Sequence, residues 1–423
     1  MNKILVICPS RIDKRELLSL SKILPYHFVF DSFSGEYLEK YLKKEEAGQS
    51  IDILETLSDL MQSYSNVPLA GIISSDDYPG SILASLIAKK FNLVGPDPKA
   101  VLHCQHKYYC RQAQKKWAPE VVPQFALVKR NGKGNLKPPF PFPLFLKPIK
   151  SYFSCFASQI NSEEEWSIAT RAPPLKSFVK PFNQLLMEYT DLKEDAADLL
   201  AEELLEGKQV TLEGYVYENK VAFLGIVDSV MYPNTISFKS FIYPSELPKK
   251  IQDRMKSAAE KCMGGLKFNN GLFNIEFIYN QQKDTVSIIE INPRISSQFA
   301  DLYEKVDGTN SYEILVSIAT GNSPLPKQRK GFFKYAASCV LRAFEDKLVK
   351  AVPSSRSIEK VRNLFPETRI EIFAEPGQCL SAGLQDGKSF RYCVIDLGGQ
   401  TIRELEEKLE ICKEILQFEM EGV

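Results

Sequence analysis

The sequence predicts two kinds of α/β architecture in one chain: an N-terminal doubly wound parallel sheet, followed by mainly antiparallel α+β structure. Short apolar runs alternate with helical patterns through the first hundred residues, as in β-α-β units. Beyond residue 140, strand-like runs come in pairs around polar turns, which is typical of hairpins. At roughly 100–200 residues per domain, 423 residues suffice for about two to four domains and a core that needs no disulfide or metal.

The N-terminal region, which we place at residues 1–98, alternates between the two types of element. Continuous apolar runs such as KILVIC are typical of strands buried on both faces. The expected elements are strands at 3–8, 27–33, 70–76 and 93–95, and helices at 16–24, 51–64 and 81–91. Pro96 and Pro98 then interrupt the chain, and a long helix at 100–116 forms a connection at residues 99–117.

Three further subdomains follow from the strand pairing and the breaks between them. Residues 118–206 form a small subdomain, with a proline-dense PPFPFP tract, strands at 145–147, 185–189 and 199–204, and a helix at 163–169. Residues 207–325 form a larger antiparallel subdomain, with hairpins at 209–229 and 272–291 and helices at 249–264 and 311–320. A polar linker at 321–331 leads to an α+β C-terminal subdomain at 326–423.

Composition excludes several classes of function. The 53 basic and 53 acidic residues balance, so we expect no nucleic-acid partner. No apolar run reaches 18 residues, so we expect no membrane span, and the first apolar run is too short for a secretory signal. Nine cysteines without a CxxC pair indicate reduced thiols and a cytoplasmic protein, and three histidines argue against a His-based metal centre.

The chemistry concentrates in the segment LFNIEFIYNQQKDTVSIIEINPR at 272–294. Glu276 and Glu290 each interrupt an apolar strand pattern, where carboxylates are normally avoided. Because side chains alternate along a strand, a hairpin turning at 280–284 sets these two carboxylates side by side, with Asn292 on the same face. Two adjacent carboxylates repel each other unless a cation lies between them. Two Glu and one Asn suit Mg²⁺, which takes its remaining ligands from phosphate and water.

Arg294 follows Asn292 by two residues and falls on the same face if the strand continues. There its guanidinium could stabilise charge on a phosphoryl group during transfer. The alternative is an ordinary edge hairpin, with two exposed glutamates and Arg294 as their salt-bridge partner. The apolar residues around both glutamates favour the metal site.

This hairpin pattern resembles the metal-binding signature of the ATP-grasp superfamily. Over nearly the whole chain, the sequence is similar to the carboxylate–amine ligase branch, which includes L-amino-acid ligases. The supporting segments are VGPDPKAVLHCQHKYYCRQ at 94–112, PLFLKPIKS at 143–151 and LLAEELLEGKQVTLEGYVYENKV at 199–221. The resemblance implies an ATP-grasp architecture, in which residues 118–206 are a lid subdomain and residues 207–325 the nucleotide- and metal-binding subdomain.

The resemblance also implies the roles of individual residues. Lys107 and Lys147 would bind nucleotide phosphates, and Lys147 and Arg294 would be catalytic. Backbone groups of Glu202, Glu203 and Leu205 would line the adenine pocket, while Gln209 or Glu213 would approach the ribose or the substrate. Glu276, Glu290 and Asn292 would hold Mg²⁺, and Mn²⁺ could replace it. Taken alone, Lys147 could equally reach solvent from a strand end, and Glu202 and Glu203 could be ordinary surface charges.

One loop departs from the family pattern. Relatives carry a glycine- and serine-rich loop that closes over the phosphates, whereas this chain has KSYFSCFASQ at 150–159, without glycine. Residues other than glycine limit close backbone approach. Either closure of the loop over the nucleotide is altered, or the hydroxyl groups of Ser151 and Ser154 take part in nucleotide binding instead.

The reaction that the resemblance implies is ATP-dependent joining of a small-molecule carboxylate to an amine through an acyl phosphate, with release of ADP and phosphate. A dipeptide ligase is its narrowest form, and a homodimer is compatible with the sequence. Two alternatives stay open: a nucleotide-binding protein without turnover, suggested by the glycine-free loop, and a biotin-dependent type of carboxylase. The sequence identifies neither substrate.

Overall fold

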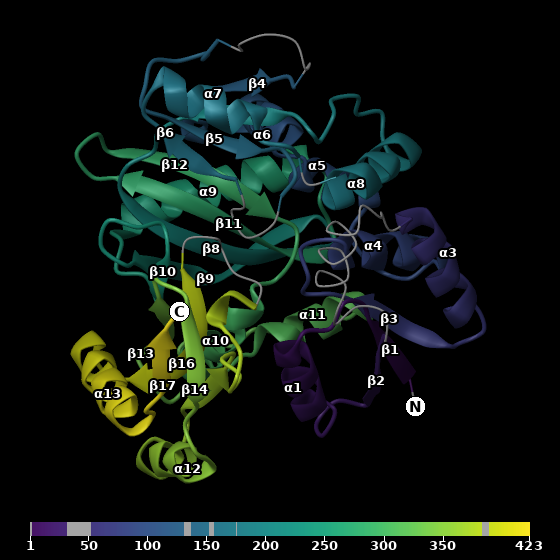
Figure 1. Cartoon of the computed structure of the whole chain (residues 1–423). Coiled ribbons are helices and arrows are strands. Elements are labelled where there is room, and N and C mark those ends of the chain that lie inside the picture. Colours follow the sequence, from purple (N-terminus) through teal and green to yellow (C-terminus); the bar gives the residue numbers. More distant parts are fainter. Residues whose placement is uncertain (1, 32–51, 131–136, 152–155, 175, 383–388) are drawn as a thin grey trace.

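The computed structural model describes residues 2–31, 52–130, 137–151, 156–174, 176–382 and 389–423. Within them, an N-terminal parallel sheet, a small antiparallel sheet and a large antiparallel sheet form the main bodies. Figure 1 shows the N-terminal unit beside the large sheet, the small sheet above it, and helices α12 and α13 at the opposite end. The described residues contain no helix long and apolar enough to cross a membrane.

The N-terminal sheet is parallel, as the sequence predicts, with the strand order β2-β1-β3. Its strands are β1 (Asn2–Val6), β2 (Tyr26–Phe30) and β3 (Leu69–Ile73). The helices around it are α1 (Arg11–Leu20), α3 (Ile53–Tyr64), α4 (Gly80–Lys90) and, from much later in the chain, α11 (Ser311–Ala319).

Both faces of this sheet are covered because its strands are apolar at successive positions. Leu5 and Ile72 pack in one core with α3 and α4, while Ile4 and Ile73 pack in another with α1 and α11. The predicted strand at 93–95 is wrong. Only three residues separate the left-handed Asn92 from Pro96, which has no N–H to donate to a ladder.

The predicted long helix at 100–116 is two helices, α5 (Pro98–Gln105) and α6 (Lys107–Trp117). The break lies at the buried His106, whose backbone is extended and whose Nδ1 accepts a hydrogen bond from the N–H of Tyr109 at 3.3 Å. A side-chain acceptor at this position begins a new helix. Lys107 is therefore the first residue of α6 instead of a mid-helix residue.

The small sheet falls within residues 118–206 and has the order β4-β7-β5-β6. Its strands are β4 (Phe125–Val128), β5 (Leu144–Pro148), β6 (Ser158–Ile160) and β7 (Leu199–Glu203). Helix α7 (Glu163–Arg171) contributes the buried Trp166 to its core. The 3₁₀ turn η1 (Pro119–Val121) precedes it.

The predicted strand at 185–189 is wrong, because these residues end helix α8 (Lys176–Tyr189). Phe178, Phe182, Leu185 and Leu186 are all buried, at the spacing of one helix face. They join the core that contains α3 and α5. The helical spacing of apolar residues along the whole of 176–189 therefore decides that this segment is a helix, although its last five residues alone resemble a strand.

The large sheet is antiparallel throughout and has the order β12-β11-β8-β9-β10-β13-β16-β15. Its strands are, in chain order, β8 (Lys208–Tyr217), β9 (Lys220–Met231), β10 (Phe238–Tyr243), β11 (Gly271–Asn280), β12 (Thr285–Asn292), β13 (Tyr335–Ala343), β15 (Arg369–Ile372) and β16 (Phe390–Gly399). Strands from residues 326–423 thus extend the sheet that carries the predicted site. Helices α9 (Lys249–Gly265) and α10 (Ala300–Asp307) pack against it.

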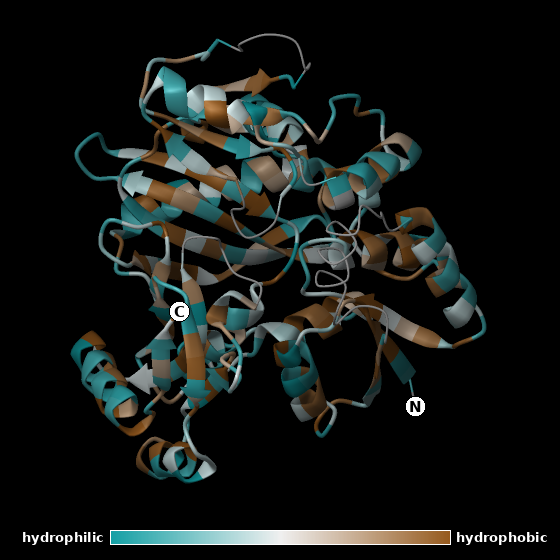
Figure 2. Ribbon diagram, in the orientation of Figure 1, coloured by the Kyte–Doolittle hydropathy of each residue, from teal (hydrophilic) through white to brown (hydrophobic). Residues whose placement is uncertain are grey.

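The remaining elements lie at the C-terminal end. They are the strand pair β14 (Lys347–Ala351) and β17 (Glu419–Gly422), helices α12 (Ser355–Leu364) and α13 (Ile402–Ile415), and the short turns η2 (Ser297–Phe299) and η3 (Leu380–Ala382). Figure 2 shows hydrophobic residues concentrated along the strands, and helices α3 and α13 with both hydrophobic and hydrophilic faces. The described cysteines are all free thiols, as expected from their scattered positions.

Candidate functional site

The acidic hairpin forms as predicted. In the antiparallel ladder of β11 and β12, Glu276 lies opposite Glu290, and Asn274 lies opposite Asn292. Because alternate residues of a strand share a face, all four side chains project from the same side of the hairpin. The neighbouring strand β8 adds Gln209, whose Nε2 donates to Oε2 of Glu276 at 3.0 Å.

The two glutamates differ in their electrostatic surroundings. Burial and the facing Glu290 carboxylate raise the pKa of Glu276 to about 7. Burial also acts on Glu290, but the ammonium groups of Lys107 and Lys147 outweigh it and lower the pKa of Glu290. Lys107 Nζ lies 3.0 Å from Glu290 Oε1. Glu290 is therefore the charged member of the pair, and Glu276 lies at the edge of ionisation near neutral pH.

A chain of amide hydrogen bonds fixes the orientation of the two asparagines. Asn274 Nδ2 donates to the carbonyl oxygen of Arg294 at 3.2 Å, which leaves Asn274 Oδ1 to accept from Asn292 Nδ2 at 3.0 Å. Since a carbonyl only accepts, this order determines which end of each amide carries the oxygen. Oδ1 of Asn292 is consequently its remaining acceptor, on the face of the two glutamates.

Lys147 on β5 is buried, and its partner is a residue that we had expected in the adenine pocket. Its Nζ lies 2.7 Å from Glu202 Oε2 and donates to the carbonyl oxygen of Ile289 at 3.3 Å. Glu202 also forms an ion pair with the buried Arg111, whose guanidinium donates to the same carbonyl at 2.8 Å. Despite burial, Arg111 and Lys147 lower the pKa of Glu202 to about 2. Burial lowers the pKa of Lys147, and Glu202 opposes this effect.

Lys107, Lys147 and Glu290 thus converge from three separate elements, the start of α6, strand β5 and strand β12. The break at His106 gives Lys107 its place at the first turn of α6. The Ile289 carbonyl precedes Glu290 and ties both Lys147 and Arg111 to β12. Together these contacts connect the small sheet with the large one.

The other predicted site residues lie on β7, on β8 and in the segments that follow β5 and β7. Glu203 lies on β7, where its N–H donates to the carbonyl of Gln124 at 3.0 Å, and Leu205 follows the strand, half-buried. Glu213 has no exposed surface and accepts from the N–H of Ser296 at 2.5 Å, so it supports the loop after Arg294 instead of facing open space. Burial raises the pKa of Glu213 to about 8. Ser151 is half-buried beyond β5, and Ser154 lies outside the described residues.

Arg294 contacts the N-terminal unit, a neighbour that the sequence did not indicate. Its Nε lies 3.7 Å from Asp77 Oδ1, and Asp77 Oδ2 lies 3.5 Å from Lys150 Nζ. Lys150 is 2% exposed, with Tyr78 and Phe182 rings 4.5 and 5.1 Å from its ammonium. Although burial raises the pKa of Asp77, Lys150 and Arg294 lower it overall.

Three residues of this site were therefore missed, namely Arg111, Asp77 and Lys150. The sequence could have indicated Lys150, because it follows the predicted site residue Lys147 by three residues in LKPIKS. It could also have indicated Asp77, because this residue comes after β3 and ligands of open parallel sheets bind beyond the carboxyl ends of strands. Arg111 looks like any surface arginine of an amphipathic helix.

The residues of the hairpin fit a divalent cation. Because the described residues contain no cluster of three or more His, Cys, Asp or Glu side chains that could hold a metal, a cation at the hairpin would need other ligands besides its two glutamates. A cation here would take Glu276, Glu290 and Asn292 Oδ1, and water or phosphate oxygens would complete the shell. That donor set suits Mg²⁺, which usually binds one or two carboxylates together with substrate phosphates. A cation would also relieve the repulsion that raises the pKa of Glu276.

Comparison with known proteins identifies the architecture. Residues 140–302, which include Lys147, Glu202 and the whole acidic hairpin, match the family model of the ATP-grasp domain. Residues 140–302 therefore contain an ATP-grasp domain. No curated protein sequence matches the chain.

Solved structures share the fold of this chain over nearly its whole length, at low sequence identity. An L-amino acid ligase from Bacillus licheniformis is 14% identical, with a TM-score of 0.71 over 100% of this chain and 99% of that one. A phosphoribosylglycinamide synthetase from Anaerococcus prevotii is 18% identical, with a TM-score of 0.67 over 99% and 100%. A biotin carboxylase from Campylobacter jejuni is 14% identical, with a TM-score of 0.64 over 99% and 92%. At such identities, the likeness establishes the fold alone.

Proposed function

We propose that the protein is an ATP-dependent carboxylate–amine ligase that acts through an acyl phosphate and releases ADP and phosphate. The observation that carries this proposal is the convergence of Lys107 and Lys147 on the paired Glu276 and Glu290. We further propose that the substrates are amino acids, the class named for one structure of the same fold.

The cations of the site suit a triphosphate. Lys107, Lys147, Lys150, Arg111 and Arg294 lie within one network with the carboxylates of Asp77, Glu202, Glu276 and Glu290. Five cations face these four carboxylates, one of which has a pKa of about 7, and the neighbouring Asp76 and Glu213 have pKa values raised by burial to about 6 and about 8. The network therefore has positive charge to offer to an anionic ligand. Ammonium groups on two sides suit phosphate oxygens.

The hairpin would hold Mg²⁺ through Glu276, Glu290 and Asn292. When bound, that ion would neutralise charge on the phosphate oxygens. Arg294 would stabilise the charge that develops on the γ-phosphoryl group as the substrate carboxylate attacks it. Glu213 would keep Arg294 in place, because it bonds the N–H of Ser296 two residues later.

The amine would then attack the acyl carbon, displace phosphate and lose a proton to form the amide. Water must be kept from the acyl phosphate during this step. The loop between β5 and β6, which contains Ser151 and Ser154, would cover the phosphates. The buried Lys150 at the start of this loop would fix one end of it through Asp77.

The test is a screen of purified protein with Mg-ATP and pooled amino acids, with ADP measured and products identified by mass spectrometry. The proposal predicts ADP formation that depends on amino acids, with a product whose mass equals the two substrates minus one water. ADP formation that requires bicarbonate and free biotin would instead indicate a carboxylase. ATP binding without ADP formation in any pool would indicate a nucleotide-binding protein.

A further inference from the structure

Arg111 is a buried arginine, 2% exposed, that lies one helical turn after Lys107 on α6. Because residues four apart on a helix share a face, α6 directs both side chains toward β12. Lys107 Nζ contacts Glu290, and Arg111 donates to the carbonyl oxygen of the preceding residue, Ile289, at 2.8 Å. Burying a guanidinium is costly unless it is paired and hydrogen-bonded, so its partners indicate which groups it holds in place.

The guanidinium of Arg111 contacts acceptors on three different elements. Its Nε donates to Glu202 of β7, and its two terminal amino groups donate to the Ile289 carbonyl of β12 and to Gln114 Oε1 of α6 itself. Gln114 is also buried, and its Nε2 donates to the Cys110 sulfur at 3.1 Å, which leaves its Oε1 to accept from Arg111. A planar fork of five N–H groups can bridge acceptors in this way, whereas the ammonium of a lysine is a compact point charge.

Glu202 connects Arg111 with Lys147. Oε1 of Glu202 accepts from Arg111, and Oε2 lies 2.7 Å from Lys147 Nζ. Lys147 Nζ also donates to the Ile289 carbonyl oxygen at 3.3 Å, and that oxygen is the second acceptor that it shares with Arg111. The four groups therefore form a closed ring, in which Arg111 fixes the position of both acceptors of Lys147.

This ring leaves Lys147 able to bind an anion. An ammonium has three N–H groups, and among the described residues two acceptors face that of Lys147, on Glu202 and Ile289. The third N–H is available to a phosphate oxygen. Because Glu202 is shared with Arg111, the ring has two cations for one carboxylate. Without Arg111, the carboxylate would neutralise Lys147 alone.

We propose that Arg111 and Glu202 are positioning residues, which aim the ammonium group of Lys147 at a nucleotide phosphate without touching the nucleotide themselves. The inference rests on the function proposed above, but only on its nucleotide-binding step. A buried arginine that merely joined the two sheets would affect stability and no particular part of the ligand. The test therefore needs a measurement that depends on the phosphates and on Lys147.

The experiment measures binding of Mg-ADP and of adenosine to the whole protein by calorimetry, in the wild type, Arg111→Lys, Lys147→Met and the double variant. Arg111→Lys preserves the charge, so its effect reports the geometry of the ring. It should weaken ADP binding by about tenfold, a usual size for residues in one network. Adenosine binding should stay unchanged, since adenosine has no phosphate for Lys147. In the Lys147→Met background, Arg111→Lys should not weaken ADP binding further, because no ammonium is left to aim.

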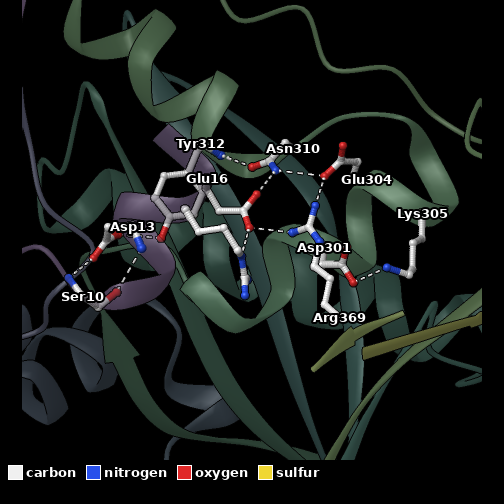
Figure 3. A network of polar contacts seen from close by, with 10 residues as sticks. Ser10, Asp13, Glu16, Asp301, Glu304, Lys305, Asn310, Tyr312 and Arg369 are labelled. Atoms are coloured by element: carbon white, nitrogen blue, oxygen red, sulfur yellow. Dashed lines mark hydrogen bonds and ion pairs between the residues drawn. The ribbon is translucent and has the colours of Figure 1, made fainter. Parts of the chain in front are cut away.

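The matched control is Arg369→Lys, the same substitution in a second buried ionic cluster. Arg369 forms ion pairs with Glu16, Asp301 and Glu304, as Figure 3 shows. This variant should be less stable but should bind ADP like the wild type.

A second variant, Glu202→Gln, keeps the size of the side chain and removes the charge that orients Lys147. It should also weaken ADP binding, and it should have no such effect in the Lys147→Met background. It tests the proposal if Arg111→Lys does not fold.

Failure of the positioning role is distinct from failure of the ligase function. Equal losses for ADP and adenosine, or losses that multiply in the double variant, would overturn the positioning role. Wild-type affinity for ADP in Arg111→Lys and Glu202→Gln would overturn it as well. The expected binding pattern, without ADP formation in any pool of amino acids, would support the positioning role and overturn the ligase function. Absence of ADP binding by the wild type would overturn both.

Discussion

Two buried ionic clusters of this protein have opposite charge imbalances. The cluster around the acidic hairpin joins five cations to four carboxylates, and its lysines come from elements on different sides. The cluster around Arg369 has three cations, Arg15, Lys305 and Arg369, for five carboxylates, Asp13, Glu16, Asp301, Glu304 and Asp396.

The comparison indicates different tasks for the two clusters. An excess of buried cations in the first cluster suits an anionic nucleotide. The second cluster has a structural task, because Arg369 of β15 bonds Glu16 of α1 across 353 positions of sequence. It joins the C-terminal strands to the N-terminal unit, as Figure 3 shows.

The largest expected effect is on the hairpin cluster. Glu290→Gln removes the charged member of the carboxylate pair and should lower Mg²⁺-dependent ADP formation by roughly 10²–10³-fold. The protein should remain folded, because the substitution preserves the size of the side chain. Steady-state ADP release measures the activity, and circular dichroism measures whether the protein is folded. The control is Glu260→Gln, which changes an exposed carboxylate on α9. Wild-type turnover in Glu290→Gln would contradict the metal assignment.

The second effect is a loss of stability without a loss of nucleotide binding, expected when the cluster around Arg369 is disrupted. Arg369→Met leaves the buried Glu16 and Asp301 without their shared guanidinium, so it should reduce the free energy of unfolding by about 3 kcal/mol. Affinity for nucleotide should stay within about twofold of wild type, since Arg369 lies outside the hairpin cluster. Denaturant unfolding and fluorescent ADP binding measure the two quantities. A loss of nucleotide affinity with unchanged stability would reverse the two roles.

The third effect is a pH dependence of the free energy of unfolding, caused by Glu213, which supports the loop after Arg294. An unfolded Glu213 ionises near its usual pKa, whereas burial raises the folded value to about 8. Stability of the wild type therefore falls as pH rises between about 4.5 and 8, because the unfolded chain releases this proton first. Glu213→Gln has no proton to release and should be more stable than wild type by roughly 2–4 kcal/mol at pH 9. The two proteins should be nearly equally stable at pH 5. A difference that does not change with pH would show that ionisation of Glu213 is not its cause.

The smallest effect is expected at the surface. Arg403 and Glu407 form an exposed i,i+4 ion pair on α13, with 86% and 60% of their side chains accessible. Arg403→Ala should change the free energy of unfolding by less than about 0.5 kcal/mol, because solvent screens such a pair. This variant is the surface counterpart of Arg369→Met. If it reduced the free energy of unfolding as much as Arg369→Met does, the distinction between buried and exposed ion pairs would be contradicted.

Local sequence pattern predicted the elements whose signal is complete within a short segment. The hairpin of β11 and β12 is an example, since the alternation of apolar residues and the polar turn determine which residues face each other. The short β1 and β3 strands are others. The end of α8 was misread because the five-residue segment LLMEY at 185–189 is too short to distinguish strand from helix.

Contacts between distant segments were beyond the sequence. The ion pair of Lys147 and Glu202 depends on β5 pairing with β7, and the sequence of neither strand predicts that pairing. The contact of Arg294 with Asp77 depends in addition on how the N-terminal unit packs. The hydrogen bond from the Ser296 N–H to the buried Glu213 likewise joins segments 83 positions apart.

The most direct test of the account is a crystal structure of the protein with Mg²⁺ and a non-hydrolysable ATP analogue. It should show the ion about 2.1 Å from carboxylate oxygens of Glu276 and Glu290, with the β- and γ-phosphates beside Lys107 and Lys147. A triphosphate bound elsewhere, with these two glutamates in contact only with water or lysine, would contradict it.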